Sequence, residues 1–538
     1  MKNITLIILL TFLTLASCKK STYEIIEVSE NSTIESSSNE TNTSEDNDTI
    51  ISDDNVTSTS NDIDSNVYIY KFTNKSNGKI TWIAWWDYFN EISLMSKTIN
   101  LSDYGINGTV KVTNLVPNYE SGLNLLESGK SYTDSLYTRL INQTLTLEKT
   151  PVIIEENRNY QKIEYPEYDS PFGLLRPVAV DNKLMNQLNS SEEDYINWKK
   201  ESISELNIQY GRENNLLRWE LHEPSLGDDY IWTSNNPGLN TDDRLTVIKS
   251  NTNSNFKMML GFNAERNGSV AYIGNDSEME DNLQMFIQTS VERYDGDGVN
   301  DFDSSISIKY WQVDNEPFIG DTWIVDKGGT TKTYARYVEL LNESVKKADP
   351  KAMVVLGAEM SPKDGKGTIT DNMREVIEYL KNKNAFDIVD IHYWGEASNY
   401  KMELAAEIRK TLDENGYSYV KIWSCENNTY VNEPAGHSSQ TEEQQAISLV
   451  KRYVYNFSHD VEKIFLTHLV DFSCFAGRCD GLFDNIGIIS DGENSGETTA
   501  TAGVKRLSYY SQVLLAQSIY GTDLTDIAII HEPKSDLD

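Results

Sequence analysis

The sequence predicts an α/β protein in which a (β/α)8 TIM barrel follows an N-terminal β-sandwich. Two patterns carry this prediction. From about residue 158 onward, eight apolar strand-like runs alternate with helical stretches, which is the repeat of a parallel barrel. Between residues 66 and 157, short runs alternate apolar and polar residues with period two and show no helical period, which is typical of an antiparallel sandwich.

The chain is long and strongly acidic. Its 538 residues leave room for about three average domains. Asp and Glu number 83 against 47 Lys and Arg, which gives a formal net charge of −36. Because such a surface repels phosphate backbones and anionic lipid, we expect no nucleic-acid partner. The charge is compatible with a neutral ligand.

The N-terminus carries a targeting signal. Lys2 precedes an apolar run, Ile4–Ala16, that is too short to span a bilayer, and the run ends in Leu15-Ala16-Ser17-Cys18. This ending resembles the lipobox of bacterial lipoproteins, which implies that residues 1–17 are a signal peptide and that Cys18 is lipidated. The resemblance implies a cell-envelope protein outside the cytoplasm, held at the membrane by its lipid alone. The alternative is an ordinary cleaved signal with a chance cysteine.

Residues 18–65 predict a disordered tether. Of the 47 residues from 19 to 65, 24 are Ser, Thr or Asn and 12 are Asp or Glu. A segment of this composition cannot bury enough apolar surface to offset the entropy lost on ordering, so we expect a flexible spacer between the membrane and the folded part.

The predicted sandwich occupies residues 66–157 and opens with a β-hairpin. Val67–Phe72 and Lys79–Trp86 alternate with period two around a polar turn that contains Asn77-Gly78. At the other end of the chain, Ile527–His531 forms an apolar strand within residues 526–538, after the last predicted helix. We expect this strand to complete the sandwich, since an exposed apolar edge would promote aggregation.

The predicted barrel spans residues 158–525. Eight repeats, with no Gly-rich phosphate loop after the first strand, favour a barrel over a doubly wound sheet. The predicted strands are Gly173–Val180, Leu216–Leu221, Lys257–Phe262, Ser307–Val313, Ala352–Gly357, Phe386–His392, Val420–Ser424 and Lys463–Val470.

Two glutamates follow predicted barrel strands directly. Glu316 stands after strand four in Val313-Asp314-Asn315-Glu316-Pro317, and Glu426 stands after strand seven in Trp423-Ser424-Cys425-Glu426-Asn427. The carboxyl ends of parallel barrel strands meet at one mouth, where active sites lie. Glycoside hydrolysis needs such a pair: one carboxyl group protonates the leaving oxygen, and the other attacks or activates water.

These segments resemble the clan A retaining glycoside hydrolases, and within them family 39 and its relatives. The resemblance covers the whole barrel in order and spacing. It implies that Glu316 is the acid/base, that Glu426 is the nucleophile and that Asn315 binds the sugar 2-hydroxyl. Asn432-Glu433-Pro434 repeats the Asn-Glu-Pro motif in a loop, without a long buried strand before it, so we interpret that copy as lying on the rim.

Further substrate-binding residues follow from the resemblance and from the aromatic residues near strand ends. The segment Ile391-His392-Tyr393-Trp394-Gly395 resembles the clan's His-x-Tyr at strand six, but a tryptophan stands where the tyrosine would donate a hydrogen bond to the nucleophile. An arginine at the predicted end of strand two resembles one found near the nucleophile, and three tryptophans are candidate sugar platforms. The substrate-binding candidates besides Asn315 are therefore His392, Trp394, Arg218, Trp219 and Trp323.

An acidic loop before strand four is a candidate calcium site. Asp295, Asp297, Asp301 and Asp303 have the early spacing of a calcium loop, although Asn300 and Ile306 depart from the EF-hand pattern at positions six and twelve. A possible structural Ca²⁺ is the only cofactor expected, and an acidic surface loop is the alternative. The six histidines form no close-spaced ligand pair, which disfavours zinc. Cys474 and Cys479 could close a disulfide.

The sequence thus predicts a membrane-anchored retaining glycoside hydrolase that acts on a neutral oligo- or polysaccharide by double displacement. A non-catalytic glycan-binding lipoprotein on a degenerate barrel is the alternative, and Trp394 is the feature in its favour. A transglycosidase would differ only in whether sugar or water resolves the intermediate.

Overall fold

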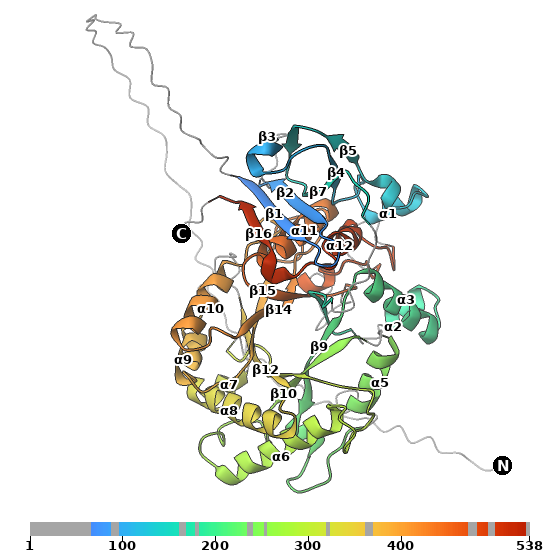
Figure 1. Ribbon diagram of the computed structural model, residues 1–538. Helices are drawn as coiled ribbons and strands as arrows, with labels where there is room; N and C mark the ends of the chain where they lie inside the picture. The colour runs from blue at the N-terminus through green and yellow to red at the C-terminus, as the bar shows by residue number, and fades with distance from the viewer. Residues whose placement is uncertain are drawn as a thin grey trace, which may run out of the picture. The chain divides into compact units, whose positions relative to one another are not determined.

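A computed structural model (Figure 1) describes the greater part of the chain after residue 65. The expected signal peptide, Cys18 and the tether lie outside the described residues. In the described part, no helix is both long enough and apolar enough to cross a membrane. The described ranges are 66–87, 96–160, 168–177, 182–233, 240–251, 255–318, 323–360, 369–471, 481–492 and 501–533.

Eight parallel strands close into a barrel, as the sequence predicts. Each strand pairs with the next along the chain, and the last pairs with the first through Ile464 and Phe172, which closes the ring and excludes the doubly wound alternative. The strands are β8 (Phe172–Leu175), β9 (Tyr210–Arg218), β10 (Lys257–Asn263), β11 (Tyr310–Val313), β12 (Met353–Met360), β13 (Ile388–Trp394), β14 (Lys421–Asn428) and β15 (Val461–Leu466).

Helices surround the barrel, and α8 shows why they form. Thr330 caps its first turn by accepting a hydrogen bond from the Thr333 N–H, and Tyr334, Val338 and Leu341 recur at helical spacing on its buried face. The helices are α2 (Asn182–Gln187), α3 (Glu192–Glu205), α4 (Trp219–His222), α5 (Thr241–Asn251), α6 (Ser277–Tyr294), α7 (Trp323–Asp326), α8 (Thr331–Ala348), α9 (Asp371–Tyr379), α10 (Glu403–Glu414), α11 (Glu442–Phe457) and α12 (Leu507–Ser518).

A six-stranded sheet precedes the barrel in the chain. A separate two-stranded sheet covers one of its faces, and a single apolar core lies between them. These layers fall short of the full sandwich expected, because the second sheet has only two strands among the described residues. The larger sheet has the order β16 (Ala528–His531), β1 (Val67–Thr73), β2 (Ile80–Trp86), β7 (Val152–Glu156), β4 (Val110–Asn114) and β5 (Thr138–Ile141), and the smaller has β3 (Lys97–Asn100) and β6 (Thr144–Leu147).

Short helices link these strands and the barrel's last segments. They are α1 (Gly122–Glu127) and the 3-10 helices η1 (Leu101–Tyr104), η2 (Thr133–Ser135), η5 (Leu482–Asn485) and η6 (Leu524–Asp526).

The period-two pattern of β1 separates two cores. Val67 and Ile69 point into the core between the two sheets. Tyr68 and Tyr70 point the other way, into the large apolar core formed by the barrel strands and their helices. Trp85 of β2 stacks on Tyr68 at 5.2 Å and is buried, so this aromatic ring fills the junction with the barrel. The sheet is therefore attached to the barrel by a continuous apolar interface.

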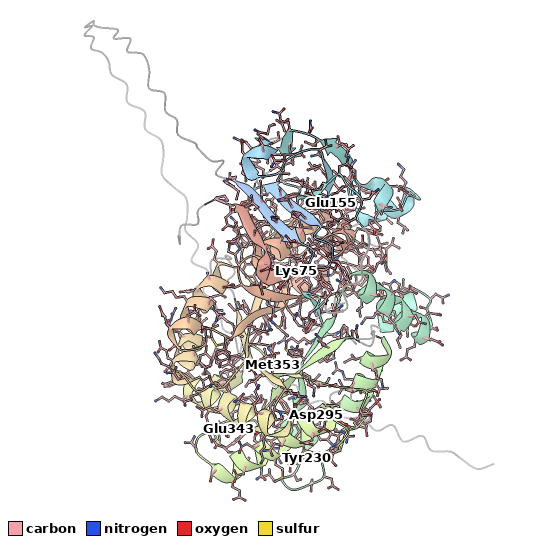
Figure 2. All side chains as sticks on the ribbon, viewed as in Figure 1. Lys75, Glu155, Tyr230, Asp295, Glu343 and Met353 are labelled. Atoms are coloured by element: carbon pink, nitrogen blue, oxygen red, sulfur yellow. The ribbon has the colours of Figure 1, made fainter. Side chains whose placement is uncertain are left out.

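The C-terminal strand joins this sheet at its N-terminal strand. In Figure 1, β16 (red) lies beside β1 (blue), and Ile69 pairs with His531 and Tyr70 with Ile529 in antiparallel register. Lys75, labelled in Figure 2, forms an ion pair with Asp526 just before β16. This is the pairing that the sequence predicts for the C-terminal segment, and it connects the two ends of the described chain.

Ending the chain at Ile527 should lower the free energy of unfolding by about 2–4 kcal/mol, because the backbone hydrogen bonds of β1 to β16 are lost. Urea unfolding of the full and shortened chains measures this. Ile529→Thr is the matched control: its side chain is 42% exposed and its backbone pairing is kept, so its stability should stay near that of the wild type. Equal stability of the full and shortened chains would contradict the prediction.

Candidate active site

Glu316 is carried by a strained turn at the carboxyl end of β11. The strand ends at Val313, and Asp314 and Glu316 both have positive φ, of 62° and 42°. Left-handed backbone at non-glycine residues is costly and persists where the surroundings fix it. Here Asp314 is buried and its Oδ1 accepts the Asn315 N–H at 2.6 Å. The turn holds Asn315 and Glu316 at the barrel mouth, where strained backbone commonly marks function.

Glu426 lies within β14, directly across the mouth from Glu316. One carboxylate oxygen of each glutamate and a ring nitrogen of His392 all lie within 4.8 Å of one another. The side chain of Glu426 is 7% exposed and that of Glu316 is 16% exposed. The structure therefore brings together the two carboxyl groups that the sequence singles out and leaves Glu316 the more accessible.

Arg212 of β9 is the cation beside Glu426. Its Nη1 donates to Glu426 Oε1 at 2.6 Å, its Nη2 donates to Asn315 Oδ1 at 2.5 Å, and its Nε donates to Gln312 at 2.7 Å. The guanidinium is fully buried. The Arg212 side chain thus fixes the position of the Glu426 carboxylate relative to the Asn315 amide.

Arg212, and not Arg218, is the arginine beside Glu426, whereas substrate binding by Arg218 at the end of β9 stays a prediction. The side chain of Arg218 is 41% exposed, and the carboxylate it pairs with is Glu220, at 3.6 Å. Strand β9 begins at Tyr210, six residues before the expected strand, so Arg212 and not Arg218 points into the barrel. The polar residues around Arg212 hide the strand pattern, so the sequence offers no clear signal for this arginine.

His392 connects the two carboxyl groups. Its Nδ1 lies 2.5 Å from Glu316 Oε1, and its Nε2 lies 3.2 Å from Asp390 Oδ2 and 3.6 Å from Glu426 Oε1. It pairs with Glu426 in the register of β13 and β14. Burial acts to lower the pKa of His392, but the negative charges of Glu426 and Asp390 outweigh it and raise the pKa to about 10.

Two positive charges lie among the carboxyl groups of the site. Arg212 contacts Glu426 and Asp390, and protonated His392 contacts Asp390 and lies 3.6 Å from Glu426. Because uncompensated charge is costly at a buried site, these cations offset part of the cost of burying the carboxyl groups.

The trio of Glu316, His392 and Glu426 also has the composition of a metal site. However, Arg212 donates to the Glu426 oxygen that faces the other two residues, and its charge would repel a cation there. We therefore interpret the trio as a hydrogen-bonded acid pair with a bridging histidine.

The aromatic candidates differ in outcome. Trp394 ends β13 beside His392, with ring centroids 5.7 Å apart, and Phe483 meets its ring edge-on at 5.4 Å. Its buried Nε1 has no hydrogen-bond partner among the described residues. Trp219 is a correction: it is fully buried and donates to Glu223, so it is a core residue and not a platform. The side chain of Trp323 lies outside the described residues.

The acidic loop converges only in part. Carboxylate oxygens of Asp295, Asp297 and Asp301 lie within 4.8 Å of one another, and burial raises the pKa of Asp295 to about 6. Asp303 is a correction: it turns away to accept from Ser305 and Lys249, and these hydrogen bonds lower its pKa to about 2. Calcium at the other three carboxylates stays a prediction.

The remaining sequence candidates are peripheral. Glu433 of the second Asn-Glu-Pro motif is exposed. Cys425, beside Glu426, is buried and free, and burial raises the pKa of its thiol. The proposed disulfide between Cys474 and Cys479 lies outside the described residues.

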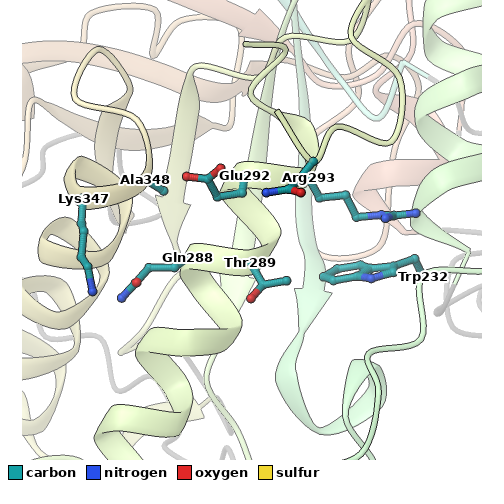
Figure 3. A pocket seen from close by; sticks show the side chains of 8 residues that line it. Trp232, Gln288, Thr289, Glu292, Arg293, Lys347 and Ala348 are labelled. Atoms are coloured by element: carbon teal, nitrogen blue, oxygen red, sulfur yellow. The ribbon is translucent and has the colours of Figure 1, made fainter. Parts of the chain in front are cut away.

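A cavity of about 340 Å³ lies away from this site (Figure 3). It is bounded by the last turns of α6 and α8, and α8 ends five residues before β12 begins, so the cavity lies toward the amino ends of the strands. Trp232 at its edge has Arg293 over its ring at 5.2 Å and Phe286 stacked on it at 6.3 Å. The cavity is therefore at the opposite end of the barrel from Glu316 and Glu426.

Comparisons with known proteins find only solved structures of low sequence identity. No family model matches it, and no curated protein matches it. Solved structures that it resembles include a glucosidase from Croceicoccus marinus (16% identity, TM-score 0.44, 62% of this chain and 65% of that one). A second is a xylanase 10B from Thermotoga petrophila in complex with xylobiose (17% identity, TM-score 0.42, 64% of this chain and 94% of that one). A third is an alpha-L-arabinofuranosidase from Thermotoga maritima (14% identity, TM-score 0.38, 59% of this chain and 63% of that one). TM-scores below 0.5 do not assign an activity.

Proposed function

We propose that this protein is a retaining glycoside hydrolase. The observation that carries the proposal is the close approach of Glu316 and Glu426 at the carboxyl ends of β11 and β14. Glu426 accepts a hydrogen bond from Arg212, and Glu316 is the more exposed of the two. Two carboxyl groups in different electrostatic surroundings can take the opposite roles that glycoside cleavage needs.

The mechanism follows from these surroundings. Glu426 attacks the anomeric carbon and forms a glycosyl ester while the glycosidic bond breaks, and Glu316 gives its proton to the departing oxygen. Glu316, now a carboxylate, then takes a proton from water, and the resulting hydroxide oxygen displaces Glu426 from the anomeric carbon. Arg212 stabilises Glu426 as a carboxylate before attack and after release.

The separation of the carboxyl groups supports retention over inversion. An inverting enzyme needs about 6.5–9.5 Å between its carboxyl groups to admit a water, whereas a retaining one needs about 5–5.5 Å. Here one oxygen of Glu316 and one of Glu426 lie within 4.8 Å. This close approach supports a retaining pair, because an inverting pair must hold both the sugar and a water between its carboxyl groups.

A glycan-binding protein without activity is the second candidate, since Trp394 replaces the tyrosine expected to support the nucleophile. That replacement does not leave Glu426 without a donor, because Arg212 donates to it. A pure binding site also gains nothing from two adjacent carboxyl groups, which repel when ionised. We therefore favour the hydrolase, of the family 39 type within clan A, with transglycosylation as a variant.

A panel of aryl glycosides tests the proposal. Xyloside, galactoside, glucoside and arabinofuranoside should be supplied to the wild type, to Glu316→Gln and to Glu426→Gln. We propose a neutral substrate because the net charge of −36 disfavours acidic polymers. Hydrolysis by the wild type, with a product that initially keeps the substrate's anomeric configuration by NMR, supports the proposal. Inverted product would contradict the retaining mechanism, and binding without turnover of any glycan tested would favour the second candidate.

We also propose that the protein is anchored to the cell envelope through lipid on Cys18. Cys18→Ser should move the protein from the membrane fraction to the soluble fraction, because the lipid is the only anchor proposed. Deleting residues 1–65 should release the protein in the same way and leave its activity unchanged, since those residues precede β1. A Cys18→Ser protein that stays in the membrane fraction would contradict the anchor.

A further inference from the structure

The cavity at the ends of α6 and α8 is lined mainly by polar side chains (Figure 3). Gln288 and Glu292 lie one turn apart on α6, Lys347 comes from the last turn of α8, and Asn300 comes from the loop that follows α6. In the part of the chain that the structure describes, none of these four side chains makes a hydrogen bond or an ion pair. Their donors and acceptors are therefore available to a ligand.

One helical turn earlier, the same two helices are joined by a hydrogen bond. Gln284 of α6 donates to Glu343 of α8 at 3.2 Å. Gln288 and Lys347 follow these two residues by four positions, so they occupy the equivalent places one turn further along each helix. There the described side chains form no such bond, and the cavity lies between them. The cavity thus takes the place of a contact that the two helices make one turn earlier.

The opposite wall of the cavity is held in place by contacts of its own. Arg293 donates to Asp242 through Nη2 at 2.7 Å and through Nε at 3.2 Å, and its guanidinium lies over the ring of Trp232 at 5.2 Å. The Phe302 N–H donates to the Arg293 carbonyl oxygen at 2.9 Å, which fixes the loop that carries Asn300. Because these walls are already ordered, a ligand would bind with little loss of conformational entropy.

The charges of the lining offset one another. Glu292 and Lys347 carry opposite charges, and the charge of Arg293 is paired with Asp242. A cavity without a surplus of positive charge, in a chain of net charge −36, favours a neutral ligand over an anion. Amide, carboxylate and ammonium groups together offer both acceptors and donors, which is what the adjacent hydroxyl groups of a sugar require. Trp232 adds an apolar wall.

We propose that this cavity is a second, non-catalytic glycan-binding site that takes a neutral sugar unit. Gln288 and Glu292 bind the sugar hydroxyl groups from α6, and Lys347 donates to them from α8. The volume of about 340 Å³ is at the lower end of the range of about 300–1,000 Å³ for ligand sites, which suits one unit of a longer chain. Because the cavity lies toward the amino ends of the strands, glycan can bind there while the barrel mouth is occupied.

Nitrogen-15 NMR of the tryptophan indoles in the full chain tests the proposal without any need for activity. Trp232 reports on the cavity and Trp394 on the barrel mouth, and each signal is assigned by its loss in the Trp→Phe variant. Titration with xylohexaose, cellohexaose, mannohexaose and galactohexaose should shift the Trp232 signal saturably for at least one of them.

The two signals separate this proposal from the proposed function. No shift of Trp232 with any of the four sugars would overturn the second site, and a shift of Trp394 alone would do so while leaving the hydrolase proposal in place. A shift of Trp232 alone would support the second site whatever the barrel mouth does. Inorganic phosphate is the competing probe: a larger response of Trp232 to phosphate than to every sugar would identify an anion site and overturn the proposal.

A pair of double variants on α6 tests the residues that make the site. Gln288→Ala combined with Glu292→Ala should weaken binding at Trp232 by about tenfold, because each lost hydrogen bond costs about 2- to 10-fold in affinity. Alanine favours the helix, so the fold should persist. Asp281→Ala combined with Gln284→Ala is the matched control, since it removes one carboxylate and one amide from α6 outside the cavity. The control should bind like the wild type, and equal affinity of the two double variants would overturn the assignment.

Discussion

Glu426→Gln should lower kcat/KM by at least about 10⁴-fold for every substrate, whatever its leaving group, because no covalent intermediate can form without the carboxylate. The amide keeps the shape of the side chain and can still accept from Arg212. Loss of activity would therefore reflect the chemistry and not the packing. Steady-state kinetics on aryl glycosides with good and poor leaving groups measures the effect.

The intermediate itself provides a second measurement. A 2-deoxy-2-fluoro glycoside with a good leaving group should inactivate the wild type and add one sugar mass to the peptide that contains Glu426. Glu462→Gln is the control, since this carboxylate bonds Lys421 and Trp423 near the amino ends of β14 and β15. Its activity should stay close to that of the wild type. Labelling of another residue would contradict the assignment. So would a Glu426→Gln enzyme whose kcat/KM stays close to that of the wild type.

The barrel could be predicted from sequence because strands buried on both faces are nearly continuous apolar runs. Strand β9 is the exception. Its first half, from Tyr210, is polar because Arg212 points into the barrel and Glu213 pairs with Arg244 of α5 on the other face, so only Leu216 and Leu217 signal a strand. The missed half contains the arginine that contacts Glu426. A charged network inside a barrel thus removes the very pattern on which strand prediction depends.

Some residues of the candidate site could likewise be predicted from the sequence, and others could not. Glu316 and Glu426 could be predicted because both follow apolar strands, and strand ends of a parallel barrel converge. The contact of His392 with Glu316 could not, because it depends on the strained turn at Asp314. Trp219 was misassigned because strand-end aromatics serve cores and ligand sites alike, and only its burial separates the two.

Glu316→Ala should reduce kcat/KM by about 10²–10⁴-fold for poor leaving groups and far less for good aryl leaving groups, because only the former need a proton to depart. With a good leaving group, the glycosyl ester on Glu426 should accumulate, since no base remains to activate water. A burst of aryl alcohol in rapid-mixing kinetics measures this. Equal losses on good and poor leaving groups would contradict the acid role.

Rescue by azide distinguishes the roles of the two glutamates. The configuration of the glycosyl azide shows which truncated side chain left space for azide to attack. In Glu316→Ala, azide should attack the glycosyl ester from the face that the acid/base vacates and restore turnover, with a β-glycosyl azide formed from a β-glycoside. In Glu426→Ala, azide can only attack the substrate directly, which gives the inverted azide. Glu433→Ala is the matched control, because Glu433 stands in the same Asn-Glu-Pro motif but is exposed on the rim. It should need no rescue. Rescue of Glu316→Ala to the inverted product would reverse the assignment of nucleophile and acid, since only double displacement through Glu426 returns the original configuration.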